Sequence, residues 1–258
     1  VKDLGAPETD ETGKMNLAQL KQFLWKSADI LRGKIDSSDY KKYIFGLLFY
    51  KRISDVWDEE YKKVLEEYHD EEIARADHNH RFQVPKDCQW SEIQKQAEGI
   101  GARLNEIFGK LTIANSPKLD KIFDDLDFAN KDKFPNDTLQ RLINNFSQHN
   151  FGDNYISSDL LGDAYEYLIG EFAAGAGKKG GEFYTPSQVS RLLAQIVSQD
   201  KKRVRSVYDP TCGSGSLLLS IGDYTEVVSY FGQELNPTTY NLARMNMILH
   251  GVHFDNFS

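Results

Sequence analysis

The chain has 258 residues, of which 40% are hydrophobic and 27% are charged, and its formal net charge is −8. This composition is typical of a soluble globular protein, and no apolar run reaches the roughly 18 to 20 residues needed to cross a bilayer, so we predict no membrane span. The acidic balance argues against a protein that binds nucleic acid by itself, but it is compatible with a role beside a basic partner. Two cysteines, Cys88 and Cys212, favour a reducing, cytoplasmic compartment, and a first residue of Val1 rather than Met suggests a fragment.

The first part of the chain, residues 1–150, is predicted to form a helical domain. Asn16 is placed to cap a first helix whose apolar stripe continues to Leu31, and a longer helix begins behind Ser38 or Asp39. Stripes of this kind form protein cores far more often than cofactor contacts, so we assign both helices to the core. The apolar face of the longer helix consists of Tyr40, Ile44, Leu47, Leu48, Val56, Trp57, Tyr61, Val64, Leu65 and Tyr68.

Several local signals add detail to this domain. The stretch Ser91–Gln94 has the form of a capping box, and the pair Ser116-Pro117 places a proline at the first position of another expected helix. His78 and His80 lie in a charged stretch that is predicted to be a loop, and no histidine spacing indicates a metal site. Two pairs on the outer face of the longer helix have the (i, i+4) spacing of supporting ion pairs, namely Asp58 with Lys62 and Glu59 with Lys63.

From residue 151 to residue 258 the pattern becomes that of a Rossmann-like α/β domain. Strands that alternate with helices at this spacing predict the start of a parallel sheet. A glycine-rich run at 175–181 separates the first two helices. In chain order, the expected elements are a helix at 160–172, a helix at about 186–197, a strand near 204–208, a leucine-rich helix, a strand near 227–232 and a helix through Leu249.

A glycine turn, DPTCGSGS from Asp209 to Ser216, follows the first predicted strand. Gly213 and Gly215 allow positive φ and a close approach of backbone amides to a ligand, as in the first turn of nucleotide-binding parallel sheets. Glu234 follows the second strand about 20 residues later, where such a sheet presents a carboxylate to ribose hydroxyls. Leu218 stands where the dinucleotide fingerprint requires glycine, so NAD is the weaker choice and the residues alone leave the nucleoside open.

A second candidate motif lies upstream, in the stretch GEFYTPSQ at 181–188. Thr185 and Pro186 begin a capping box, and the free amides at the start of the helix suit a carboxylate or another anion. The alternative is a well-capped helix with Phe183 and Tyr184 packed inward. The residues alone do not decide between these two interpretations.

Three stretches, GGEFYTPSQVSRLL, VYDPTCGSGSLLL and FGQELNPTTYNLARMNMILHG, resemble in order and spacing the cofactor-binding motifs of the modification subunit of type I restriction-modification systems. The stretch from Asp29 to Asp55 resembles the helical N-terminal domain of that family, so the resemblance covers nearly the whole chain. It implies an S-adenosylmethionine-dependent methyltransferase that modifies adenine N6 in DNA. It also implies four partners: DNA, a specificity subunit that reads the DNA sequence, a second modification subunit and, in some complexes, an endonuclease/translocase subunit.

The resemblance implies a cofactor site made of three segments. The residues beside the methionine part of the cofactor would be Glu182, Phe183, Tyr184, Thr185, Pro186 and Ser187. The backbone cradle would consist of Thr211, Cys212, Gly213, Ser214, Gly215 and Ser216. Asp209 would accept hydrogen bonds from an amine or from amides of the turn, and Glu234 would bind the ribose. Cys212 would be present because it is small and not because its thiol reacts.

One family motif has no counterpart in this sequence. Amino-methyltransferases of this kind carry an Asn-Pro-Pro-aromatic tetrapeptide that holds the amine of a flipped adenine. The Asn236-Pro237 pair is followed by Thr238 and comes just after Glu234, which is the wrong place. We therefore assign no catalytic residue here and interpret the chain as the N-terminal part of a larger subunit, inactive by itself. The alternatives are a non-catalytic helical module that contacts the specificity subunit or DNA, and a nucleotide-linked oxidoreductase, which Leu218 disfavours.

Overall fold

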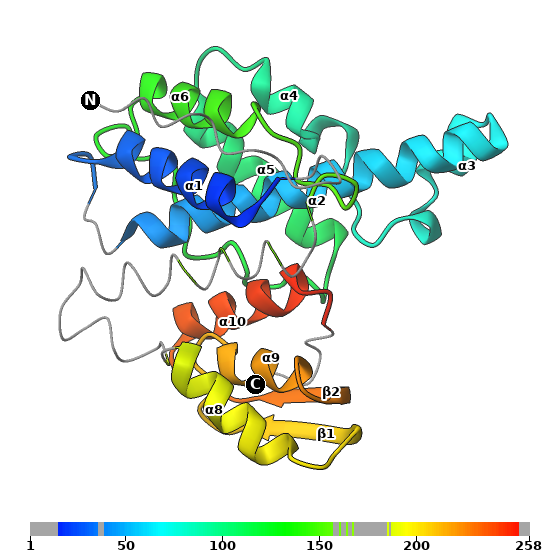
Figure 1. The fold of residues 1–258 in the computed structure, drawn as a ribbon. Helices are drawn as coiled ribbons and strands as arrows, with labels where there is room; N and C mark the ends of the chain where they lie inside the picture. Colours follow the sequence, from blue (N-terminus) through cyan, green and yellow to red (C-terminus); the bar gives the residue numbers. More distant parts are fainter. Residues whose placement is uncertain are drawn as a thin grey trace, which may run out of the picture. The chain divides into compact units, whose positions relative to one another are not determined.

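The computed structural model describes residues 15–35, 39–156, 160, 164, 167, 185 and 187–252. The chain divides into two compact units, Val1–Leu160 and Leu161–Ser258 (Figure 1). The first unit is helical, and the second contains a small parallel sheet with helices, so the predicted fold class is confirmed. Among the described helices, none combines the length and the apolar character needed to span a membrane.

In the first unit one long helix, α2, contacts several shorter ones, among them α1, α3 and α4 (Figure 1). Helix α6 packs against α1, α4 and α5. The described helices of this unit are α1 (Leu17–Leu31), α2 (Tyr40–Tyr68), α3 (Glu71–Arg75), α4 (Trp90–Gln94), α5 (Ile100–Ala114) and α6 (Asn136–Phe146), with 3-10 turns at Asp77–Asn79 and Lys86–Cys88.

The first two helices begin where the sequence predicts. Asn16 Oδ1 accepts the N–H of Gln19 at 2.9 Å, and Gln19 Oε1 accepts the N–H of Asn16 at 2.9 Å, so the capping is reciprocal. Helix α2 starts at Tyr40, directly after Asp39. The predicted apolar face of α2 is buried over its first half, but Tyr68 near its end is 55% exposed. The short helix α3 packs beside that end of α2 (Figure 1), and Tyr68 stays on the surface.

Two other predicted helix starts are wrong. Ser91 lies inside α4, and the first N–H of that helix, at Trp90, donates to Ser54 Oγ on α2 at 2.9 Å. A tertiary contact thus takes the place of the local cap. The pair Ser116-Pro117 leads into consecutive turns rather than into a helix. His80, predicted to lie in a loop, follows a 3-10 turn and is buried.

Aromatic rings fill the core of the first unit. The ring of Tyr50 on α2 lies 5.1 Å from that of Trp90 on α4 and 5.8 Å from that of Phe108 on α5. Phe23 on α1 meets Phe146 on α6 edge to face, with ring centroids 5.0 Å apart. Each such pair contributes about 0.5–1.5 kcal/mol beyond the burial of its area. These contacts join α4 and α5 to α2, and α1 to α6, without regular spacing in the sequence.

A buried ion pair connects α2 with the segment that follows α6. Lys51 and Asp55 are 4% and 5% exposed and form a salt bridge within α2. Asp55 Oδ2 also accepts the N–H of Phe151 at 2.8 Å, and Arg52 donates to the carbonyl of Phe151 and to Asp153. Burial raises the pKa of Asp55 and lowers the pKa of Lys51, while each charge opposes the shift of the other. The pair is stable in charged form only because these bonds compensate for lost water.

The predicted pairing of Glu59 with Lys63 gives way to a backbone contact. Both carboxylate oxygens of Glu59 accept the N–H of Asn154, at 3.2 and 3.3 Å. Gly152 lies so close that a Cβ there would be 2.0 Å from Glu59 Oε1. The segment 151–154 is therefore held against α2 along more than one helical turn.

In the second unit, two parallel strands precede the segments that contain Asp209–Ser216 and Glu234. Strand β1 (Arg203–Asp209) pairs with β2 (Glu226–Gly232), in a register that matches Asp209 with Gly232. A small core of Cys212, Leu218, Ala243 and Met247 lies beside them. The described helices are α8 (Ser187–Ser198), α9 (Ser216–Gly222) and α10 (Pro237–Leu249), as predicted. Residues 160, 164 and 167 are helical, but the rest of the predicted helix at 160–172 and the run at 175–181 lie outside the described residues.

In the first unit, α5 meets a neighbouring segment at a distance that only glycine permits. A Cβ at Gly101 would lie 2.0 Å from the carbonyl oxygen of Phe128. One turn later, Asn105 Oδ1 accepts the N–H of Phe128 at 3.0 Å, and Asn105 Nδ2 donates to Asp127 Oδ1 at 2.8 Å. Gly109, on the same helix, has nothing within 4 Å of the place of a Cβ. The two glycines of α5 therefore differ only in what surrounds them.

We expect Gly101→Ala to lower the free energy of unfolding by about 1–3 kcal/mol, because the new methyl group must displace backbone atoms of Phe128. Gly109→Ala is the matched control and should raise it by about 0.5–1 kcal/mol, since alanine loses less entropy in a helix. Urea denaturation of both variants measures the two changes. Equal effects of the same sign would show that α5 and the 127–129 segment are not in close contact.

Candidate cofactor-binding site

The chain turns from β1 into α9 through two glycines with left-handed backbone conformations. Gly213 has φ 56° and Gly215, the N-cap of α9, has φ 83°. A Cβ at Gly215 would also lie 2.5 Å from the Cε of Met247 on α10. Both glycines thus supply the positive φ that the sequence predicts. The close approach at Gly215, however, is to the core of its own unit and not to an open face.

Three hydrogen bonds hold this turn in place. Cys212 donates its N–H to the carbonyl of Gln233 at 2.9 Å, and Gln233 donates its N–H to the carbonyl of Asp209 at 2.9 Å. These two bonds continue the pairing of β1 with β2 beyond the strand ends. From the other side, Asn246 Nδ2 on α10 donates to the carbonyl of Ser214 at 3.0 Å. The turn is therefore rigidly attached to both β2 and α10.

Some backbone donors of the turn make no internal bond. The N–H groups of Gly213 and Ser214 have no hydrogen-bond partner among the described residues. The hydroxyls of Ser214 and Ser216, both buried, lie 2.9 Å apart and bond to each other. Consecutive free amides at a strand-to-helix turn are the arrangement that accepts polar groups of nucleotide-like ligands.

Two carboxylates flank the turn. Asp209 Oδ1 accepts the N–H of Thr211 at 2.9 Å, and Glu234 Oε1 accepts the N–H of Asn236 at 2.8 Å. In each case the second carboxylate oxygen has no partner in the described part of the chain. Helix α10 is capped by Asn236, whose Oδ1 accepts the N–H of Thr239 at 3.1 Å. Glu234 therefore stabilises the segment that leads into α10, and its second oxygen can accept a hydrogen bond from a ligand hydroxyl.

The thiol of Cys212 faces this negative environment from a buried position. Its pKa is raised to about 12, first by burial and then by the charges of Asp209 and Glu234. A thiol with this pKa is neutral at physiological pH and is a poor nucleophile. The prediction that Cys212 serves by its size agrees with this environment.

The upstream motif lies mostly outside the described residues, namely Glu182, Phe183, Tyr184 and Pro186. Thr185 stands just before α8, and Ser187 is the first residue of that helix. The cap by Thr185, with Pro186 in the first turn, therefore stays a prediction. Whether this motif meets the glycine turn stays a prediction.

Sequence reasoning missed the partners that position the turn. Asn246 is fully buried in α10, between Met245 and Met247, and its Oδ1 has no partner among the described residues. A polar residue inside an otherwise apolar stripe is the signal that could have identified it, because buried polar groups are almost always bonded. Gln233 holds the turn through its backbone N–H and carbonyl groups. Because every residue type except proline has both groups, the sequence does not reveal this role.

Two protein families match the chain over adjacent ranges. Residues 20–146 match the HsdM N-terminal domain, and residues 156–258 match the N-6 DNA Methylase family. In the second match, the range includes β1, the glycine turn, β2 and Glu234.

Similar full-length proteins are named as methylase subunits. The type I restriction enzyme MpnII methylase subunit of Mycoplasma pneumoniae is 36% identical over 91% of this chain and 50% of its own length. The MjaVIII methylase subunit of Methanocaldococcus jannaschii is 33% identical over 95% of this chain and 43% of its own. The crystal structure of a type I restriction-modification methyltransferase subunit from Streptococcus thermophilus is 36% identical, covers 93% of this chain and 57% of that chain, and has a TM-score of 0.79. The chain thus spans about half the length of the curated relatives it matches.

We expect both thiols to react slowly with a thiol reagent in the native protein at about pH 8, because Cys88 and Cys212 are buried and each has a pKa raised to about 12. Unfolding in guanidinium should make both react quickly, and mass spectrometry of the labelled peptides identifies which cysteine has reacted. Fast labelling of Cys212 in the native chain would contradict a purely structural role for its side chain.

Proposed function

Since the chain belongs to the family of type I restriction enzyme methylase subunits, we propose that its second unit holds part of the site for S-adenosylmethionine. The full-length subunit then transfers the methyl group of this cofactor to adenine N6 in DNA. When bound, the cofactor supplies an electrophilic methyl group on a sulfonium sulfur. The residues of this chain bind and orient it; they do not take part in the transfer.

The observation that carries this proposal is the meeting of the glycine turn with Glu234 at the carboxyl ends of two parallel strands. Parallel α/β sheets bind their ligands at this edge. The free N–H groups of Gly213 and Ser214 suit the polar atoms of the cofactor, and the second oxygen of Glu234 suits the ribose hydroxyls. Asp209 Oδ1 accepts the N–H of Thr211, an amide of the turn, and its second oxygen is proposed to accept a bond from an amine of the ligand.

The other assignments rest on the family alone. We propose that Glu182, Phe183, Tyr184, Thr185, Pro186 and Ser187 lie beside the methionine part of the cofactor. We further propose a helical domain at 1–150 that contacts partners or DNA, followed by the cofactor-binding part at 151–258. The partners of the full-length protein are DNA, a specificity subunit, a second modification subunit and an endonuclease/translocase subunit. A cytoplasmic location suits a DNA substrate and the free thiols of Cys88 and Cys212.

We expect Glu234→Ala to weaken binding of S-adenosylmethionine to the full-length subunit by about 10- to 150-fold, since it removes a charged acceptor from the ribose hydroxyls. Cys212→Ser is the matched control and should change affinity much less, because only the backbone of residue 212 lies in the cradle. Calorimetric titration measures both affinities, and a parallel titration with NAD tests cofactor choice.

Thermal melting separates this role from a structural one. Glu234 also bonds the N–H of Asn236, so its loss should lower the melting temperature slightly. The contradicting result is a Glu234→Ala protein that melts at a lower temperature and still binds S-adenosylmethionine normally. That result would show that the carboxylate only stabilises the segment before α10 and is not part of the cofactor site.

We expect a protein of residues 1–258 to transfer no methyl groups to DNA, even with cofactor and specificity subunit supplied. The sequence holds no Asn-Pro-Pro-aromatic tetrapeptide to orient the amine of a flipped adenine. Incorporation of labelled methyl groups into target DNA measures this, with a full-length family member as the positive control. Specific incorporation by residues 1–258 would show that another group positions the base.

A further inference from the structure

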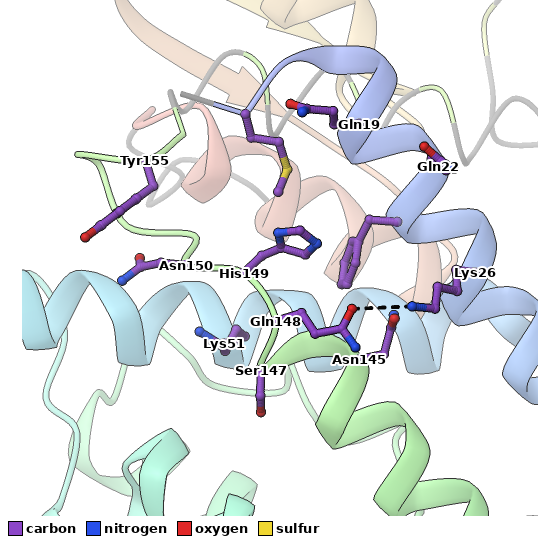
Figure 2. Close-up of a pocket in the computed structure, with 12 residues that line it drawn as sticks. Gln19, Gln22, Lys26, Lys51, Asn145, Ser147, Gln148, His149, Asn150 and Tyr155 are labelled. Atoms are coloured by element: carbon purple, nitrogen blue, oxygen red, sulfur yellow. Dashed lines mark hydrogen bonds between the residues drawn. The ribbon is translucent and has the colours of Figure 1, made fainter. Parts of the chain in front are cut away.

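A polar groove lies in the first unit, between α1, α6 and the segment 147–155 (Figure 2). Its volume is about 810 Å³, within the range of about 300–1,000 Å³ that is usual for small-molecule sites. The chain carries 39 aspartates and glutamates, but none of the 12 residues that line the groove is acidic. The groove is part of neither predicted motif.

Asn145, on α6, presents a buried acceptor at this groove. Its side chain is 3% exposed, and its Nδ2 donates to Ser27 Oγ at 3.0 Å. Ser27 in turn donates its hydroxyl proton to the carbonyl of Phe23 at 3.1 Å, so the amide nitrogen of Asn145 must face Ser27. Asn145 Oδ1 then has no hydrogen-bond partner among the described residues. A ligand that donates a proton to this oxygen would remove the cost of an unsatisfied buried group.

A positive charge lies beside this acceptor. Lys26 on α1 donates to Gln148 Oε1 at 3.3 Å, and Figure 2 shows both side chains next to Asn145. No acidic side chain of the described residues forms an ion pair with Lys26. The second lysine of the groove, Lys51, is already paired with Asp55. The groove therefore offers one lysine for a negatively charged group, next to side-chain amides.

An aromatic surface completes the groove. His149 lines it, and its ring packs edge to face against Phe23 with centroids 5.3 Å apart. Burial, and then the charges of Lys26 and Lys51, lower the pKa of His149, so the ring is neutral near physiological pH. A neutral imidazole provides a flat face on which another planar ring can stack.

We propose that this groove binds a nucleotide, with its phosphate on Lys26, its base against His149 and an N–H group of the base donated to Asn145 Oδ1. A carboxamide oxygen such as Asn145 Oδ1 can accept an N–H group on the edge of a base. A neutral peptide would also match them but brings no negative charge for Lys26. The nucleotide is either free or part of a DNA strand, and this binding does not depend on S-adenosylmethionine or on methyl transfer.

The test is a titration of the chain with deoxyadenosine monophosphate, a short single-stranded oligonucleotide, its duplex and inorganic phosphate, followed by two-dimensional NMR. We expect the nucleotide-containing probes to shift the side-chain amide signals of Asn145 and Gln148 and the ring signals of His149. Saturation by the mononucleotide indicates a free nucleotide, and saturation by an oligonucleotide alone indicates a nucleotide within DNA. Phosphate alone should bind much more weakly, because it cannot reach both Lys26 and Asn145.

Three substitutions make the result specific. Lys26→Gln should weaken nucleotide binding by about 5-fold, the effect of losing one exposed charge contact. Lys131→Gln, which removes an exposed lysine outside the groove, should leave binding unchanged. Asn145→Ala removes the acceptor Oδ1 and should also weaken nucleotide binding, and Gln148→Ala is used in its place if the buried substitution prevents folding. The proposal is overturned if no nucleotide shifts these signals, if Lys26→Gln and Lys131→Gln act alike, or if a neutral tripeptide shifts them and nucleotides do not.

Discussion

The arrangement of the helical unit depends on the buried ion pair between Lys51 and Asp55. Removing two charges from water costs several kcal/mol per ion unless other bonds compensate. Here Asp55 also accepts the N–H of Phe151, and Arg52 donates to the carbonyl of the same residue. The segment after α6 is thereby fixed to α2, Phe151 enters the aromatic core, and residues 148–150 come to border the groove. The hydrogen bonds that compensate for the buried charges therefore also position residues 148–150 at the groove.

The sequence predicts the helices of this unit but not the ion pair that positions the loop beside them. An apolar residue at every third or fourth position is a local signal, so α1 and α2 are found from spacing alone. Lys51 and Asp55 have the same (i, i+4) separation as Asp58 and Lys62 further along α2, and spacing cannot tell a buried pair from a solvated one. What distinguishes the first pair is Phe151, which is 96 residues from Asp55 in the chain. A contact over that separation has no local pattern.

The second unit is predicted more completely, because its backbone path is set by glycine and proline. Gly213 and Gly215 adopt the positive φ that their positions indicate, and α10 begins at Pro237, after the predicted strand. The exception is Asn246, whose bond to the carbonyl of Ser214 spans 32 residues. Residue type can indicate a required backbone conformation. It does not indicate which distant carbonyl will accept a hydrogen bond from a buried side-chain amide. The role of the upstream motif at 182–187 stays a prediction for a simpler reason, since most of it lies outside the described residues.

In the proposed cofactor site, the backbone and the side chains have different roles. The free amides come from Gly213 and Ser214, while the side chains nearby are either bonded to each other or, like Cys212, neutral and buried. Because the turn is already attached to β2 and α10, binding a ligand there requires little loss of backbone freedom. On this proposal, affinity depends on the path of the backbone, and ligand choice depends on the charges of Asp209 and Glu234. A side-chain change that keeps this path affects the site less than a change at either glycine, where a larger residue costs about 1–2 kcal/mol to hold in the left-handed region and favours a backbone path that moves the amides.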